Sequence, residues 1–158
     1  MLGLGFVSER HDLHDSPVLV RRFDALGAQG INMGTRFMCT VEAPIHDKVK
    51  QALLNANERE TNLIFRTMRN TSRVLKNAVS DQVVAMEKEG AKFEEVRHLV
   101  AGARGRVAVR TGDIDTGIVS AGMVVGLIHD IPTCAELLER IVRECRECLR
   151  RAVDMVAA

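Results

Sequence analysis

The chain has 158 residues, which is enough for one globular domain and few for two. Its 22 basic and 21 acidic residues nearly cancel, and Trp and Tyr are absent, so composition argues against a nucleic-acid surface of basic and stacking aromatic side chains. No apolar run reaches the roughly 18 residues of a membrane span, the start M-L-G-L-G-F lacks the charged region of a signal peptide, and the four cysteines lack the spacing of a disulfide scaffold. We expect a cytoplasmic protein without nucleic-acid or membrane partners.

The N-terminal part divides into a lead-in and a helix-strand unit. Residues 1–16 show little hydrophobic periodicity and are interpreted as a disordered lead-in; H-D-L-H-D within them is more simply a solvated segment than a metal cluster. Ser16 and Pro17 are typical of a helix start, and Gly27 is typical of its end. The apolar character of Gly30–Met38 then predicts a parallel strand that is buried on both faces.

The middle of the chain is predicted to be mainly helical. Pro44 opens a helix whose apolar residues fall on one face, and Leu63–Phe65 are predicted as a second strand. The Arg- and Asn-rich segment 66–77 is interpreted as a surface connection rather than a nucleic-acid patch. Two more helices are predicted, one from Ser80 to Lys88 and one from Phe93 that ends at Gly102. Residues 103–113 are predicted to be a loop.

Two further helices are predicted at the C-terminal end. The first is apolar, runs from Ile118 to Ile128 and carries Gly122 and Gly126 on one face, where they allow close approach of a neighbour. The second follows Pro132 and begins with a capping-box pattern, in which Thr133 precedes Glu136 by three residues. Its apolar residues keep a helical period for about 20 residues, which makes it the most strongly predicted element.

Few residues suggest chemistry by themselves. Cys145 and Cys148 form a C-x-x-C pair inside the last predicted helix, on its apolar face, and are interpreted as buried structural cysteines because a redox pair sits at a helix start. His129 and Asp130 are adjacent but have no nucleophile nearby in sequence, and a histidine after a helix end is favoured by the helix dipole. His46 and His98 are predicted to be surface residues. The residues alone indicate no catalytic machinery and no metal site.

Gly34 and Thr35 give a weak indication of an anion site. They follow the predicted strand, where unpaired backbone N–H groups at a turn or helix start approach an anionic group. A plain turn explains the same residues equally simply.

Three stretches considered together are more specific. They read G-A-Q-G-I-N-M-G-T-R-F-M (27–38), R-N-T-S-R-V-L-K-N (69–77) and S-A-G-M-V-V-G-L-I-H-D-I-P (120–132). In this order they resemble the C-terminal half of nitronate monooxygenases, formerly called 2-nitropropane dioxygenases, and of the related FMN-dependent enoyl-acyl-carrier-protein reductases. The resemblance implies an α/β protein, the C-terminal fragment of a (β/α)₈ (TIM) barrel that holds FMN at its C-terminal face and carries an inserted helical segment.

The resemblance also implies a site and a domain plan. Asn32, Met33, Gly34 and Thr35 match the family's FMN-binding element, with the backbone amides of Gly34 and Thr35 at the phosphate. Many relatives have Gln in place of Met123. The family's catalytic histidine lies upstream of the matched region, so no catalytic residue is assigned. The plan is a final barrel unit at 17–42, a helical insertion at 43–117 and, at 118–158, C-terminal helices that pack back on the barrel.

The implied activity is the FMN-dependent oxidation of alkyl nitronates by O₂ to carbonyl compounds and nitrite. A barrel of this type needs about 250 residues, so we expect this chain to be truncated and inactive alone. Two alternatives remain open: a non-catalytic helical interaction or oligomerisation module, and a protein of the enoyl reductase type.

Overall fold

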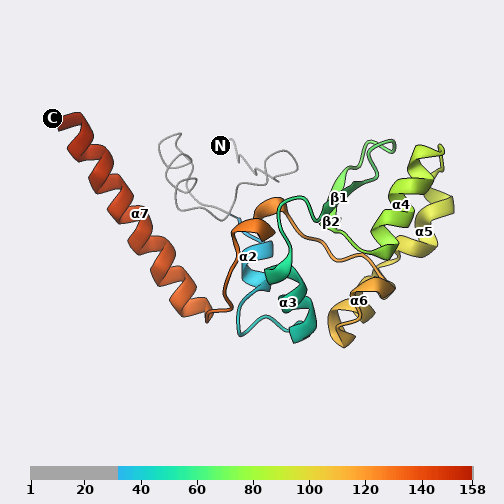
Figure 1. Ribbon diagram of the computed structural model, residues 1–158, viewed down its shortest axis with the longest axis horizontal. Coiled ribbons are helices and arrows are strands. Elements are labelled where there is room, and N and C mark those ends of the chain that lie inside the picture. The colour runs from blue at the N-terminus through green and yellow to red at the C-terminus, as the bar shows by residue number, and fades with distance from the viewer. Residues whose placement is uncertain (1–31, 158) are drawn as a thin grey trace, which may run out of the picture.

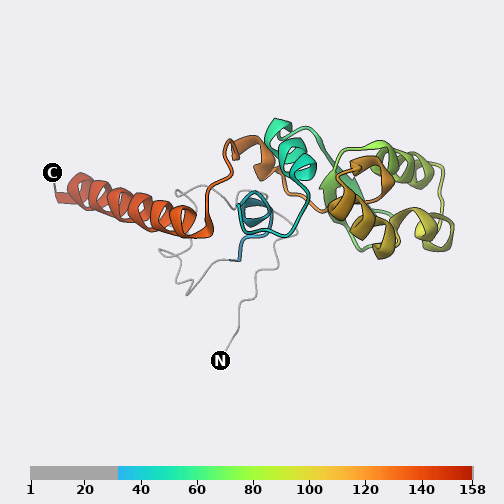
Figure 2. The same cartoon turned by 90° about the horizontal axis from the view of Figure 1, so that it is seen from below.

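The computed structural model describes residues 32–157 of the chain (Figure 1). The predicted lead-in 1–16, the predicted helix up to Gly27 and the start of the predicted strand lie outside the described residues. The described part is elongated. The long C-terminal helix extends from one end, and a helical group occupies the other end (Figures 1 and 2).

The described elements are mostly helices. In chain order they are α2 (Thr35–Met38), α3 (Asp47–Asn55), β1 (Thr61–Ile64), β2 (Ser72–Leu75), α4 (Ala78–Lys88), α5 (Phe93–Val100), α6 (Gly102–Thr111), the 3-10 helices η1 (Ile114–Thr116) and η2 (Met123–Leu127), and α7 (Cys134–Ala157). This arrangement confirms the predicted helix-rich α/β class. None of the described helices is long and apolar enough to cross a membrane.

The small sheet joins segments that are distant in sequence. β1 pairs antiparallel with β2, with Thr61 opposite Leu75. A single bridge then connects Val74 to Ser120, and the Leu75 amide donates to the Val119 carbonyl at 2.8 Å. β1 confirms the strand predicted at Leu63–Phe65, although it begins earlier and ends one residue sooner. Segment 66–77, which was interpreted as a surface connection, contains strand β2. Two residues of this strand, Val74 and Leu75, are buried.

Two hydrophobic clusters hold these elements together. One lies among α2, α3, η2 and the segment before η2, and it contains the fully buried Leu53 and Val125. The other lies between the hairpin and helices α4 and α5, and its members are Ile64, Val74, Val79, Val83, Val96 and Leu99. β2 contributes Val74 to the second cluster and Leu75 to the first, because successive strand side chains point to opposite faces.

Most predicted helices are present, and their caps explain their starts. The predicted Thr133–Glu136 capping box forms at the start of α7, where the Thr133 amide donates to the Glu136 carboxylate at 2.8 Å. Helix α4 begins two residues before the predicted Ser80. Asn77 is its cap: the Asn77 side chain accepts from the Ser80 amide, and the Ser80 hydroxyl accepts from the Asn77 amide.

The cap of α4 also closes a long excursion of the chain. Asn77 is buried, and its side-chain amide donates to the carbonyls of Ile114 and Gly117, the latter at 2.8 Å. One side chain therefore caps a helix and ties together two points 40 residues apart in sequence.

Three predictions of secondary structure are wrong, and they concern a strand, a helix and a loop. The strand predicted at Gly30–Met38 does not extend to its predicted end, because Asn32 and Met33 are irregular and Thr35–Met38 form α2. The apolar helix predicted at Ile118–Ile128 is instead an extended segment followed by η2. Its continuous apolar run reflects burial against neighbours on both sides rather than a helical face.

The predicted loop 103–113 contains most of helix α6. This helix has two glycines and buries only Ala108, so its sequence has no apolar stripe. Its packing depends on close backbone contact instead: a Cβ at Gly117 would lie 2.5 Å from the Arg104 carbonyl carbon, and one at Gly105 would lie 2.8 Å from the Ile118 carbonyl oxygen. Glycines, which favour a loop in a sequence-based prediction, here permit close contact between the backbone of α6 and the backbone of residues 117 and 118.

The turn of the hairpin is held by a buried carboxylate. Phe65 and Arg69 have φ of 61° and 55°, which is uncommon for residues other than glycine. Glu87 of α4 accepts from the Phe65 amide at 2.8 Å and from the Thr67 hydroxyl at 3.1 Å. These bonds help to hold the turn in its uncommon conformation.

We expect Leu53→Ala to lower the free energy of unfolding by about 2–5 kcal/mol, because it leaves a cavity in a fully buried position. Leu127→Ala removes the same atoms from a side chain that is 56% exposed and should change stability far less. Urea unfolding of the two variants, followed by circular dichroism, checks this difference. Equal losses for both variants would contradict the assigned core.

Candidate functional site

The sequence-predicted site residues lie at the start of α2. Gly34 is the N-cap of this helix, Asn32 and Gly34 are exposed, and Met33 and Thr35 are half-buried. Because α2 starts at Thr35, the first amides of the helix have no intrahelical partner. A Cβ built on Gly34 would meet no atom within 4 Å, so the space beside these amides is open.

One hydrogen bond connects this helix start to a second part of the site. The Gly122 amide donates to the Thr35 hydroxyl oxygen at 3.0 Å. This bond uses a lone pair of the hydroxyl, whose own proton is still able to reach an acceptor. Thr35 and Gly122 are 87 residues apart in sequence, so the fold brings together the first and third resemblance stretches.

The second resemblance stretch adjoins the third. The Ala121 amide donates to the Arg73 carbonyl at 3.4 Å, next to the bridge between Val74 and Ser120. The order in space is therefore β2, then residues 119–122, then the start of α2. The half-buried Met123 directly follows Gly122 at the start of η2.

A buried arginine fixes the other side of α2. The Arg36 side chain is 7% exposed, and its guanidinium binds the Asp130 carboxylate and donates to the Asp130 carbonyl at 3.0 Å. The second carboxylate oxygen of Asp130 accepts from Arg140 of α7 at 2.7 Å. Asp130 thus joins α2 to the first turns of α7, and Arg36 is committed to this pair rather than to an external anion.

A buried lysine and a backbone bond secure the segment after α2. The Lys50 ammonium donates to the carbonyls of Thr40, at 2.7 Å, and Val41, at 3.2 Å. The Val41 amide donates to the Pro132 carbonyl at 3.0 Å. The segment that follows α2 is therefore held in place by a charged side chain and by a backbone hydrogen bond.

Three carboxylates around this junction have lowered pKa values. Burial acts to raise the pKa of Asp130, but the Arg140 hydrogen bond and the charges of both arginines outweigh it, so the pKa lies below its ordinary value of 3.8. The backbone amide of Cys134 lowers the pKa of Glu42, and that of Thr133 lowers the pKa of Glu136. The start of α7 therefore favours ionised carboxylates.

The histidines that the sequence analysis considered lie at exposed positions. His129 is exposed, and its neighbour Asp130 is used by the two arginines instead of orienting an imidazole. His98 is exposed as predicted, and His46 is an exposed cap whose ring accepts from the Lys48 amide. Within residues 32–157, no group of three His, Cys, Asp or Glu residues could hold a metal ion.

The prediction of buried C-x-x-C cysteines is wrong in this structure, where Cys145 and Cys148 are half-buried. They lie within α7, whose apolar side chains are largely exposed. Gly126 does allow a close approach, as predicted, since a Cβ there would lie 2.9 Å from the Glu58 amide nitrogen. The supporting residues Arg36, Lys50 and Thr40 were missed, because nothing in their sequence spacing indicates burial.

Comparison with known proteins gives the family. The family model described as nitronate monooxygenase matches residues 21–144 of the chain. The chain belongs to the nitronate monooxygenase family. The predicted resemblance is confirmed. The matched region contains all three stretches on which the resemblance rests, 27–38, 69–77 and 120–132.

Curated relatives are distant and longer. A nitronate monooxygenase of Neurospora crassa is 25% identical over a region that covers 80% of this chain and 34% of the relative. A (3aS,4S,5R,7aS)-5-hydroxy-7a-methyl-1-oxo-octahydro-1H-indene-4-carboxyl-CoA dehydrogenase of Rhodococcus jostii is 24% identical, over 76% of this chain and 44% of the relative. The chain thus spans between about a third and about half of the length of these relatives.

Solved structures share the fold. FabK from Thermotoga maritima matches with a TM-score of 0.81 and 27% identity, over 89% of this chain and 44% of that protein. The enoyl reductase domain of MlnA from Bacillus amyloliquefaciens matches with a TM-score of 0.62 over 90% of this chain and 48% of that domain, and at 14% identity it supports the fold alone.

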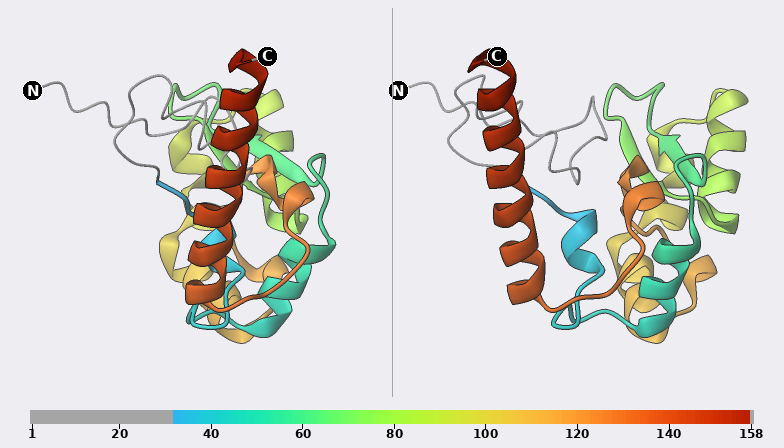
Figure 3. Two further views of the ribbon diagram at one scale, coloured as in Figure 1. Left: turned by 90° about the vertical axis from the view of Figure 1, so that its left-hand side faces the viewer. Right: turned by 60° about the vertical axis from the view of Figure 1, so that its left-hand side comes forward.

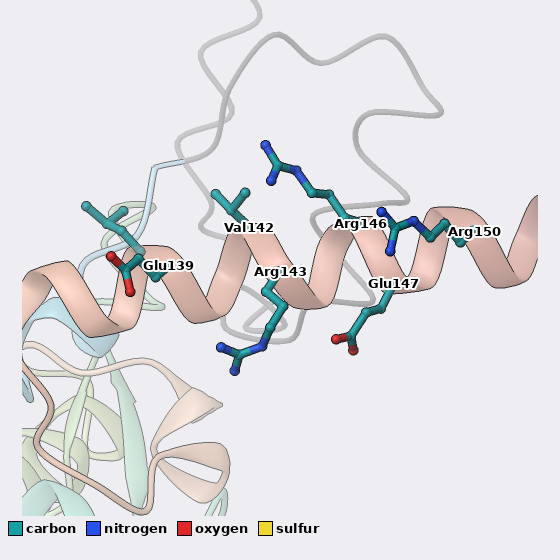
Figure 4. Close-up of a pocket in the computed structure, with 7 residues that line it drawn as sticks. Glu139, Val142, Arg143, Arg146, Glu147 and Arg150 are labelled. Carbon is teal, nitrogen blue, oxygen red and sulfur yellow. The ribbon is translucent and has the colours of Figure 1, made fainter.

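The residues present fit the phosphate end of a flavin nucleotide. They offer amides without a partner inside the helix, an anchored hydroxyl and open space at Gly34, which together suit an anion. A groove of about 490 Å³ is lined by side chains of α7 and by none of these residues (Figure 4).

We expect Asp130→Asn to lower stability at neutral pH, because it leaves the buried Arg36 without its counter-ion. The pKa of Asp130 is lowered in the folded chain. Its contribution to the free energy of unfolding is therefore fully present above about pH 3.8 and is lost as the pH falls through the lowered pKa. Urea midpoints of the variant and the unaltered chain should therefore differ at pH 7 and converge as the pH falls below 3.8 through the lowered pKa of Asp130.

The exposed Asp154 of α7 is the matched control for this experiment. Asp154→Asn should leave the urea midpoint nearly unchanged at every pH. A difference between Asp130→Asn and the unaltered chain that persists at the lowest pH would show that the ion pairs are not its cause.

Proposed function

We propose that this chain supplies the phosphate-binding part of an FMN site in a flavin-dependent oxidoreductase, and that Asn32, Met33, Gly34 and Thr35 form that part. The observation that carries the proposal is the start of α2. Its first amides have no partner within the helix, a Cβ on Gly34 would meet no atom within 4 Å, and the Thr35 hydroxyl accepts a hydrogen bond from the Gly122 amide. Family membership supports the same cofactor.

In this proposal the chain's own residues bind the phosphate of FMN and orient it. The amides of Gly34 and Thr35 hold the phosphate, the Thr35 hydroxyl adds a donor, and the Arg36–Asp130 pair keeps α2 in position. FMN, when bound, supplies the redox chemistry. We assign no catalytic residue, because the catalytic histidine that the family resemblance implies lies upstream of the matched stretches.

We propose the oxidation of an alkyl nitronate by O₂ to a carbonyl compound and nitrite as the activity of the whole enzyme type. The family match and the Neurospora crassa relative support this reaction. A small-molecule nitronate is accordingly the proposed substrate. A second candidate is reduction of an enoyl thioester, which the likeness to FabK at 27% identity favours.

A phosphate-dependent interaction with FMN is the direct test. We expect FMN added to the purified chain to bind, and riboflavin, which lacks the phosphate, to bind at least about tenfold more weakly, a loss of about 1.4 kcal/mol. Flavin fluorescence titrations measure both affinities. Equal binding of the two flavins would show that the phosphate does not contribute to the affinity, which would contradict the proposal.

The open space at Gly34 allows a matched pair of variants. Gly34→Glu places a negative charge beside the phosphate and should weaken FMN binding at least about tenfold, since like charges repel at close range. Gly34→Gln has the same shape without the charge and should retain most of the affinity. If neither variant changes FMN affinity, the flavin does not bind at this helix start.

Turnover separates the two reactions. Nitronate oxidation consumes O₂ and releases nitrite, whereas enoyl reduction consumes a reduced nicotinamide. We expect neither from this chain alone with FMN, because it spans less than half of the length of its relatives. Nitrite release that requires both chain and FMN would contradict this inactivity and favour the nitronate reaction.

The non-catalytic alternative makes a different prediction. A helical interaction module would bind neither flavin, yet would unfold cooperatively on heating, as its two hydrophobic clusters suggest. Cooperative unfolding without flavin binding would therefore favour that alternative.

A further inference from the structure

Lys50 of α3 carries a buried positive charge that has no counter-ion. The residue is only 4% exposed, and its ammonium donates to the carbonyls of Thr40, at 2.7 Å, and Val41, at 3.2 Å. Among the described residues, no carboxylate forms an ion pair with it. A charge that is buried without an opposite charge is costly for a fold. An anion that binds within reach of Lys50 would offset this cost.

The charge lies at the far end of the helix whose start is the candidate anion site. Helix α2 lies between the start of α7 and helix α3 (Figures 1 and 3). Thr40, which accepts from Lys50, follows the last residue of α2 by two positions. At about 1.5 Å per residue, the distance from the Thr35 amide to the ammonium is on the order of 10 Å. A charge still acts over this distance where protein, rather than water and salt, fills the space between.

The other charges around α2 do not cancel that of Lys50. Asp130 is shared between Arg36 and Arg140, so these three side chains together keep one positive charge. Glu42 is exposed, so water screens its charge, and its carboxylate accepts from the Cys134 amide at 2.9 Å. The groups around the helix therefore leave a positive balance. Such a balance favours a multiply charged anion over a neutral ligand.

We propose that the buried charge of Lys50 strengthens binding of the FMN phosphate at the start of α2 without touching it. This inference rests on the proposed function, because it concerns the same phosphate site. The amides of the helix start supply directed hydrogen bonds, and Lys50 supplies charge from the opposite end of the helix. Its bonds to two carbonyls fix the position of that charge before any ligand arrives.

A purely structural role for Lys50 makes a different prediction. The Thr40 carbonyl has a second donor, the Ala43 amide at 3.4 Å, and Val41 is at the surface, so the segment does not depend on the ammonium alone. Lys50→Met removes a buried charge that has no counter-ion. In the absence of flavin we therefore expect its urea midpoint to be unchanged or raised. A structural tie would instead show a lowered midpoint.

Removal of the charge is the direct test. Flavin fluorescence titrations of the full chain measure affinity for FMN and for riboflavin, which lacks the phosphate. Lys50→Met and Lys50→Gln should each weaken FMN binding at least about fivefold and leave riboflavin binding unchanged, because the charge acts on the phosphate. Lys50→Gln keeps a hydrogen-bond donor for the carbonyls, so its loss isolates the charge. Circular dichroism establishes that each variant is folded.

Two further variants are controls. Lys50→Arg keeps the positive charge and should retain FMN affinity within about twofold. Lys48→Met removes an exposed lysine of the same helix, whose charge is screened by water, and should leave both affinities unchanged. An equal effect of Lys48→Met and Lys50→Met would show that net charge alone, rather than the buried position, determines the affinity, and would overturn the proposal.

The remaining outcomes separate this inference from the proposed site. Equal binding of FMN and riboflavin to the unaltered chain would overturn the phosphate site itself. A preference for FMN that survives in both neutral variants would leave that site intact and overturn the role of Lys50. A loss of affinity for both flavins, together with a lowered urea midpoint, would show that Lys50 is a structural tie and not a source of charge for the phosphate.

Discussion

The arrangement of the described elements depends on the buried guanidinium of Arg36. A cation with a side chain only 7% exposed needs a charged partner, because burial of an unpaired charge is very costly. Asp130 is that partner, and its second oxygen binds Arg140. One carboxylate therefore sets the positions of α2, the segment before α7 and the start of α7. The bond from Gly122 to Thr35 then connects the start of α2 to the segment before η2.

This constraint relates the candidate site to the family. The groups without a partner inside α2 are its first backbone amides, whereas the charged side chains nearby bind one another. A site of this kind recognises an anion through main-chain geometry, so its sequence requirement is a glycine and a hydroxyl in a rigid setting rather than a cluster of basic residues.

Elements with a local signal were predictable, and those determined by distant contacts were not. The stripe and capping box of α7 were sufficient to predict that helix, and the periodic apolar residues of α3 and α5 to predict theirs. Helix α6 was missed because glycine contacts replace an apolar face, and η2 was mistaken for an α-helix because its residues are buried on several sides. The family was predictable from three combined stretches, but the burial of Arg36 and Lys50 was not, since it depends on partners far away in sequence.

The Asn77 side chain has a consequence for how such a protein changes over evolutionary time. Its bonds to Ile114 and Gly117 bring the two ends of the segment that contains α4, α5 and α6 to one place. Insertions or deletions between these ends change the length of the segment, while the two ends stay next to each other and next to β2. Lineages are thus free to lengthen, trim or resurface these helices without displacing the glycine and threonine at the start of α2, provided that the asparagine is retained.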